Sequence, residues 1–292
     1  MALNLKTFTT RTLTAAIFVG VLLSCICWNY ISFTALFLIV SIWGLFEFYQ
    51  ISEKLGAKPY KWIGYIIGIS LFCYSSLSNS VLGLCDPVEK LLPFIFVFIF
   101  CAFIIALFDR DSNTILNISF TLAGVVYAVI PFMILVNIAC MDKSYILPSH
   151  SGNWYDMAPY NFHYVLGIIL LIWASDVCAY LVGSLIGKHK LYERISPGKT
   201  WEGSIGSAIL TIGCSFVMAH WFQELPLKHW VVISVLVSVF GTIGDLVESM
   251  LKRQAGIKDS GKIMPGHGGI LDRFDSLLFV TPFIYAYLIL IQ

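Results

Sequence analysis

Residues 164–186 read YVLGIILLIWASDVCAYLVGSLI, a stretch that is apolar except for one acid. It decides the class of fold, because a membrane-spanning helix needs about 20 mainly apolar residues. Comparable windows lie near residues 13–31, 32–50, 61–78, 91–108, 116–140, 204–222, 229–248 and 276–291. Of the 292 residues, 58% are hydrophobic and 12% are charged, whereas an average soluble domain carries about 25% charged residues. The sequence therefore predicts an all-α polytopic integral membrane protein with about nine transmembrane helices.

The distribution of positive charge predicts the topology. If the N-terminus is cytoplasmic, nine spans leave only three of the 18 lysines and arginines outside, namely Lys90, Lys143 and Lys228. Cytoplasmic loops are enriched in these residues, so we expect an inner N-terminus and an outer C-terminus. The net charge of +1 hides this basic inner face, which would attract anionic lipid head groups and nucleotides. Nucleic acid is a poor partner, because the basic residues lie in short loops between spans.

The chain divides into two parts that differ in polar content. We expect residues 1–160 to form an N-terminal transmembrane scaffold of about five helices, with few ionisable side chains in its spans. We expect residues 161–292 to form a C-terminal catalytic region of about four helices and two polar cytoplasmic loops. The eight cysteines are scattered through apolar runs and form no CxxC pair, which favours inert buried thiols over zinc ligands or disulfides.

The one acid in the 164–186 window is Asp176. A carboxylate at that depth costs about 2.5–3.5 kcal/mol on insertion scales, so it needs a partner or a wet cavity. Helical spacing places Tyr180, Gly183 and Gly187 on the same stripe, and the two glycines form a GxxxG that would let another helix approach closely. The stripe fits either a functional acid or ordinary packing around a hydrogen-bonded one.

The next loop, residues 187–203, combines basic side chains with glycine and serine. Lys188 and Lys199 could contact phosphate there, together with free backbone amides. The alternative is a loop that only retains positive charge on the inner face. Gly198-Lys199-Thr200 resembles the end of a P-loop, but Glu193 stands where its first glycine is required and no strand precedes it, which excludes that motif.

Residues 249–275, SMLKRQAGIKDSGKIMPGHGGILDRFD, form the densest polar block of the chain. Just before it, Asp245, Glu248, Ser249 and Lys252 recur at i, i+3, i+4 and i+7 and so share one helix face. Two carboxylates beside a cation suggest a site for a divalent metal with phosphate oxygens as further ligands. An interfacial face of salt bridges is the alternative.

Two more acids and a histidine end this block. Asp272 and Asp275 share a face at i, i+3, and Asp245 and Asp272 could meet across two helix ends at the cytoplasmic membrane surface. His267 in the Pro-Gly-His-Gly-Gly run suggests an oxyanion loop, but the chain has no GxSxG nucleophile elbow, so serine hydrolysis is excluded.

The block resembles the signature of the phosphatidate cytidylyltransferases, the CDP-diacylglycerol synthases of membranes. The matching groups are Lys252-Arg253, Lys258-Asp259, His267-Gly268-Gly269 and Asp272-Arg273-Phe274-Asp275. Further similarity runs through Trp173, Asp176, Ala179-Tyr180, Gly187-Lys188, Ser196-Pro197, residues 199–203, Gly244-Asp245 and Glu248-Ser249. The resemblance covers about the last 120 residues, while the first 160 share only hydrophobicity.

The resemblance implies an integral membrane enzyme that converts CTP and phosphatidate to CDP-diacylglycerol and diphosphate. It implies dependence on Mg²⁺, a homodimer, and an active site on the cytoplasmic leaflet of the bacterial inner membrane. It implies that Asp245 and Asp272 hold the metal, and that the catalytic set is Asp245, Asp272, Lys252, Arg253, Asp259 and His267. The substrate-binding set that it implies is Asp176, Lys188, Ser196, Lys199, Thr200, Glu248, Ser249, Lys258, Gly268, Gly269, Arg273 and Asp275.

Two alternatives compete with this interpretation. An ion-coupled membrane transporter could line its path with Asp176, Asp245 and Glu248, but a pore needs polar residues through the whole membrane depth, and these cluster toward one face. A CDP-alcohol phosphotransferase would carry an Asp-Gly-x-x-Ala-Arg pattern, which is absent from the sequence.

Overall fold

The structure is a computed structural model that describes residues 5–78, 91–109, 113–141, 160–261, 263 and 268–291. Ten helices fill most of these ranges: α1 Leu5–Trp28, α2 Tyr30–Lys54, α3 Lys61–Ser78, α5 Leu91–Phe108, α6 Thr114–Ala128, α7 Ile130–Ala139, α8 Phe162–Ile186, α9 Trp201–Trp221, α10 Leu227–Gln254 and α11 Leu271–Leu290. A short antiparallel ribbon joins α8 to α9 and consists of β1 Lys190–Tyr192 and β2 Ser196–Thr200.

The all-α membrane class is confirmed. Each predicted apolar window lies largely within a helix, and the window at 116–140 lies on the consecutive helices α6 and α7. Within the described ranges, six helical segments are long and apolar enough to cross a membrane: α2, the α6–α7 pair, α8, α9, α10 and α11. The apolar parts of α1 and α5 are shorter, and α3 is not among the six, so the total of nine spans stays a prediction.

The chain forms two compact units. The first contains residues 1–137 and 254–274, and the second contains residues 138–253 and 275–292. The segment 254–274 of the polar block thus packs with the N-terminal helices. The functional division predicted at residue 160 into scaffold and catalytic region stays a prediction.

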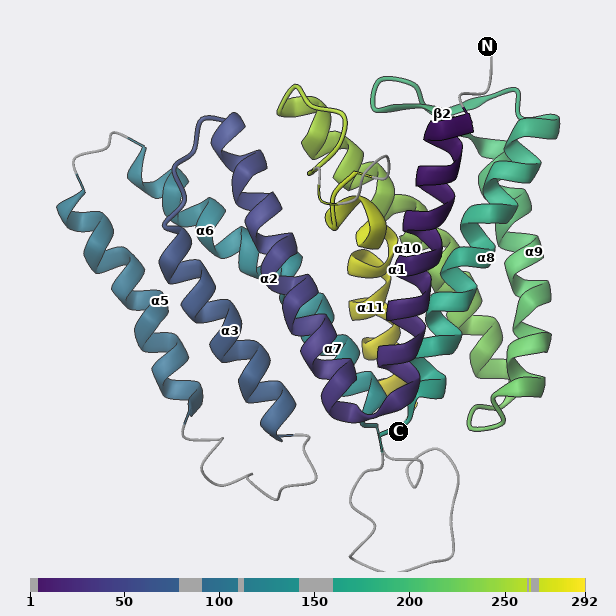
Figure 1. Cartoon of the computed structure of the whole chain (residues 1–292), viewed down its shortest axis with the longest axis horizontal. Helices are drawn as coiled ribbons and strands as arrows, with labels where there is room; N and C mark the ends of the chain where they lie inside the picture. The colour runs from purple at the N-terminus through teal and green to yellow at the C-terminus, as the bar shows by residue number, and fades with distance from the viewer. Residues whose placement is uncertain are drawn as a thin grey trace, which may run out of the picture. The chain divides into compact units, whose positions relative to one another are not determined.

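In the first unit, α2 packs against α1, α3 and α6, and α3 packs against α5 (Figure 1). Small residues allow this closeness around Tyr49 of α2, which is fully buried. A Cβ atom on Gly124 of α6 would lie 2.7 Å from the Tyr49 ring, and the Tyr49 hydroxyl donates a 2.9 Å hydrogen bond to the Thr121 carbonyl. The aromatic ring therefore fills the space that glycine leaves between two helices.

In the second unit, α8 and α9 lie side by side (Figure 1). Gly183 of α8 faces Gly203 of α9 so closely that a Cβ on Gly203 would lie 3.1 Å from the Gly183 Cα. One turn deeper, the Ser207 hydroxyl donates a 2.7 Å hydrogen bond to the Ser175 carbonyl. The close helix approach expected from the glycine stripe is confirmed for Gly183.

The two ends of α9 offer a test of the predicted topology. Its 21 residues extend about 30 Å, enough to cross the hydrocarbon core, so its two ends should face opposite sides of the membrane. Glu193 in the ribbon before α9 and Gln223 just after it are both exposed. In a cysteine-free background, Glu193→Cys should resist an impermeant thiol reagent in intact cells and react after permeabilisation. Gln223→Cys should react in intact cells, and the reverse pattern would contradict the inner N-terminus.

Candidate active site

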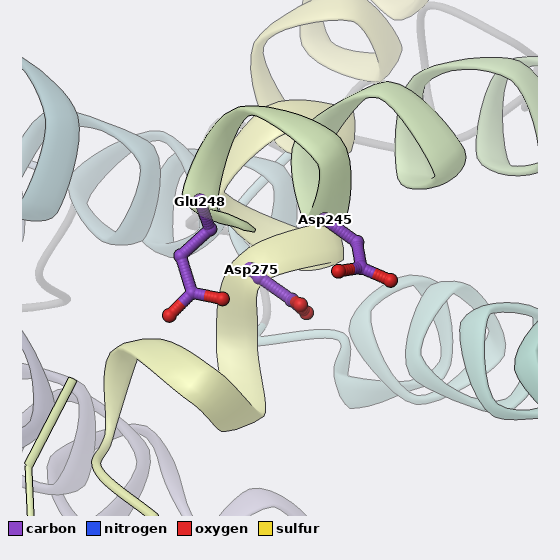
Figure 2. Close-up of side chains that lie close together, drawn as sticks. All are labelled: Asp245, Glu248 and Asp275. Carbon is purple, nitrogen blue, oxygen red and sulfur yellow. The ribbon is translucent and has the colours of Figure 1, made fainter. Parts of the chain in front are cut away.

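Three carboxylates of the second unit gather at one point. Asp245 and Glu248 stand one turn apart on α10, and Asp275 comes from the first turns of α11. One oxygen from each lies within 4.8 Å of the others, and Figure 2 shows the three side chains on the same side of α10. The backbones meet closely here, because a Cβ on Gly244 would lie 2.7 Å from the Asp275 carbonyl oxygen. Glycine at 244 therefore brings the acids of α10 and α11 together.

Two lysines neutralise part of this negative charge. The Lys199 ammonium, at the end of the ribbon, lies 2.5 Å from Asp245 Oδ2 and 3.4 Å from the Thr242 carbonyl oxygen. The Lys252 ammonium lies 2.7 Å from Glu248 Oε2. The Glu248 side chain is 1% exposed and that of Asp245 is 33% exposed, so one end of the cluster is buried in the protein and the other is accessible to solvent. Carboxylates this close disfavour one another's ionised form, and the neighbouring ammonium groups offset that repulsion.

The chemistry of this donor set fits a hard divalent cation. Mg²⁺ prefers oxygen ligands, keeps several waters and shares its remaining positions with phosphate oxygens. Three carboxylates with an accessible edge satisfy those requirements, and the two lysines add charge that can meet phosphate. The cluster (Asp245, Glu248 and Asp275) is thus a candidate metal and phosphate site.

Two of the predicted acids, Asp275 and Asp272, have different partners in the structure. Asp275, predicted as a substrate contact, joins Asp245 and Glu248 in the cluster. Asp272 lies in the first unit, where its Oδ2 accepts hydrogen bonds from the Ser260 amide at 2.8 Å, the Ser260 hydroxyl at 3.0 Å and the Gly269 amide at 2.8 Å. A metal shared by Asp245 and Asp272 stays a prediction.

The glycines of the signature form a tight turn over Asp272. Gly268 has φ +83°, a conformation that side chains rarely adopt, and a Cβ there would also lie 2.5 Å from Asp272 Oδ2. A Cβ on Gly269 would lie 2.2 Å from the Ser260 hydroxyl oxygen. The glycine pair is therefore required for the backbone to approach the carboxylate.

Two residues fix the 254–274 segment to the N-terminal helices. The Phe274 ring packs edge-on against Phe132 at 5.4 Å and against Phe18 at 5.8 Å between ring centroids. The second is Glu47 of α2, which is 1% exposed and accepts hydrogen bonds from the segment. Glu47 was not predicted as a functional residue, although a lone carboxylate in the apolar 32–50 window is a signal of the same kind as Asp176.

The other predicted residues lie in several places, and Ser249 and Asp176 lie close to the cluster. Ser249 donates a 3.3 Å hydrogen bond to Asp245 Oδ1, and the buried Thr200 caps α9 by accepting the Gly203 amide at 3.2 Å. The Lys188 amide bonds to Glu202 at 3.1 Å, and Ser196 begins β2. Exposed side chains are those of Asp176, Lys188, Arg253, Lys258, Asp259 and Arg273. His267 lies outside the described residues, and the substrate roles of this group stay predictions.

Residues 9–291 match the cytidylyltransferase family. A phosphatidate cytidylyltransferase of Staphylococcus haemolyticus (strain JCSC1435) is 50% identical over 129 residues, which are 44% of this chain and 49% of the relative. One of Staphylococcus aureus (strain COL) is 46% identical over 138 residues, 47% of this chain and 53% of the relative. The chain spans about half the length of the curated relatives it matches. The match over nearly the whole chain shows that this membrane protein belongs to the cytidylyltransferase family.

Proposed function

We propose that the chain is a phosphatidate cytidylyltransferase, which converts CTP and phosphatidate to CDP-diacylglycerol and diphosphate. The observation that carries the proposal is the cluster of Asp245, Glu248 and Asp275 with Lys199 and Lys252 in contact with it. Family membership and the names of the staphylococcal relatives support it. Acids that can hold a divalent cation, with ammonium groups beside them, suit the positioning and charge neutralisation on which transfer between phosphates depends.

Each part of the cluster has a task in this reaction. The three carboxylates would hold Mg²⁺, which when bound neutralises phosphate charge and stabilises the leaving diphosphate. Lys199 and Lys252 would orient the triphosphate, and the exposed Arg253, Lys258 and Arg273 are further candidates for phosphate contacts. The phosphate of phosphatidate is already anionic and can attack the α-phosphorus of CTP directly. We therefore assign no covalent protein intermediate and no general base.

The membrane location follows from the substrate. Phosphatidate keeps its acyl chains in the bilayer, so the cluster must open at the head-group level of one leaflet. The distribution of basic residues favours the cytoplasmic leaflet of the bacterial inner membrane, where CTP is available. We propose that the protein works there, with the homodimer implied by the family resemblance.

A direct assay tests the function. Purified full-length protein in detergent with phosphatidate, Mg²⁺ and CTP labelled at the α-phosphate should move the label into a lipid that chromatographs as CDP-diacylglycerol. Diphosphate should appear in equal amount, and CTP labelled at the γ-phosphate should leave the lipid unlabelled. No labelled lipid, together with ion-driven solute flux in proteoliposomes, would favour the transporter alternative.

A further inference from the structure

Glu47 is a buried acid far in sequence from the polar block that it contacts. It lies on α2 with 1% of its surface exposed, and both carboxylate oxygens accept hydrogen bonds. Oε1 accepts from the Ile270 amide at 2.9 Å, and Oε2 accepts from the Leu271 amide at 3.0 Å. These amides stand at the start of α11, where the helix dipole and free N–H groups favour an anion. Glu47 thus caps α11 from another helix.

A serine connects Glu47 to Asp272. The Ser260 hydroxyl oxygen lies 2.7 Å from Glu47 Oε2 and 3.0 Å from Asp272 Oδ2, and Ser260 is 5% exposed. A hydroxyl has a single proton to donate, so the two carboxylates share one hydrogen-bond donor. The Ser260 amide also donates to Asp272 Oδ2 at 2.8 Å. The position of Ser260 therefore determines the position of the Asp272 carboxylate.

The backbone around Glu47 leaves no room for adjustment. A Cβ on Gly261 would lie 2.3 Å from Glu47 Oε1, and a Cβ on Gly269 would lie 2.4 Å from Glu47 Oε2. Gly261 follows Ser260, whose amide donates to Asp272. The amide of Gly269 donates to Asp272 directly. The described residues 260, 261 and 269–271 thus surround two carboxylates, those of Glu47 and Asp272.

We propose that Glu47 is a positioning residue: through Ser260 and the amides of Ile270 and Leu271 it holds the Asp272 carboxylate in the orientation needed to bind a divalent cation. The inference deepens the proposed function and rests on it, and it takes up the prediction from the sequence that Asp272 is a further metal ligand. It gives the N-terminal region a role beyond that of a scaffold. Groups that orient metal ligands typically change metal affinity about 10–100-fold when they are replaced.

The test compares two glutamates of the same helix. Glu47→Gln keeps the side-chain size but places an NH₂ group against donors, so one of the three bonds must be lost. Glu53→Gln is the matched control, because Glu53 lies on α2, is exposed and pairs with Lys61 at 2.7 Å. Binding of Mn²⁺ to the full-length protein in detergent, followed by electron paramagnetic resonance, should weaken about tenfold in Glu47→Gln and stay unchanged in Glu53→Gln. The Mg²⁺ concentration for half-maximal activity should rise in parallel.

Ser260→Ala keeps the proposal testable if Glu47→Gln does not fold. It removes the connecting hydroxyl and leaves the bonds of Glu47 to Ile270 and Leu271 in place. We expect it to weaken Mn²⁺ binding as well, and to add little in a Glu47→Gln background, because both changes break the same chain of contacts. Wild-type affinity in Ser260→Ala, or in a folded Glu47→Gln, overturns the inference, as does a wild-type protein that binds no Mn²⁺.

These outcomes separate the inference from the proposed function. A wild-type protein that forms no CDP-diacylglycerol, while Glu47→Gln still weakens Mn²⁺ binding, refutes the function and leaves the positioning role of Glu47 standing. An active wild-type protein whose two variants bind Mn²⁺ normally refutes only the positioning role.

Discussion

Replacing Asp245 or Asp275 by asparagine should lower the rate of CDP-diacylglycerol formation by about 10³-fold, the loss expected when a main electrostatic group is removed from a polar site. Asparagine keeps the shape of aspartate but lacks the charge, and these two acids lie with Glu248 within 4.8 Å of one another. The loss should be measured as initial rates over a range of Mg²⁺ concentrations. Asp272→Asn should give a comparable loss if Asp272 is also a metal ligand.

A matched aspartate controls for the general effect of removing a charge. Asp109 is exposed and accepts a 2.7 Å hydrogen bond from Tyr60. It is distant in sequence from Asp245, Glu248 and Asp275, and we assign it no role in the reaction. Asp109→Asn should keep normal turnover. Near-normal turnover of Asp245→Asn or Asp275→Asn at limiting Mg²⁺ would remove that residue from the metal site.

Gly269→Ala should abolish most activity by deforming the turn over Asp272. The added methyl group would lie 2.2 Å from the Ser260 hydroxyl oxygen and 2.4 Å from Glu47 Oε2, so the backbone must shift. A displacement of about 1 Å at a catalytic group can cost 10²-fold in rate, and forced overpacking costs about 1–3 kcal/mol in stability. We expect at least a hundredfold loss of turnover together with a lower melting temperature in detergent.

Gly213→Ala is the matched control for this substitution. Gly213 lies inside α9 with nothing within 4 Å of the position that its Cβ would take. Alanine is the better helix former, so this variant should be as active and at least as stable as the wild type. Equal activity of Gly269→Ala and Gly213→Ala would contradict the tight turn over Asp272.

The helices were predictable from the sequence because a membrane span is a long and uniform signal. The windows at 32–50, 164–186 and 204–222 each coincide with a described helix, since some 20 apolar residues in lipid must satisfy their backbone hydrogen bonds internally. The number of spans was less certain, because the apolar parts of α1 and α5 are shorter. Length and hydropathy alone do not decide whether such helices cross the bilayer.

The site was predictable in its location and less so in its partners. The polar block and the face with Asp245 and Glu248 stood out by spacing alone. Asp272 and Asp275 share one face of α11, so spacing alone could not single out Asp275 as a neighbour of Asp245. That contact depends on the closeness to Asp275 that Gly244 of α10 allows. The contact of Glu47 with Ser260 joins residues 213 positions apart, which no local pattern reveals.

The stereochemical course at phosphorus tests most directly that the lipid phosphate attacks CTP without a protein intermediate. CTP carrying one diastereomer of an α-phosphorothioate, phosphatidate and the wild-type protein should give CDP-diacylglycerol with inverted configuration at that phosphorus, because one in-line displacement inverts it. Labelled CTP without lipid should leave no label on the protein after quenching. Net retention of configuration, or a cytidylylated protein, would show two displacements and contradict direct attack.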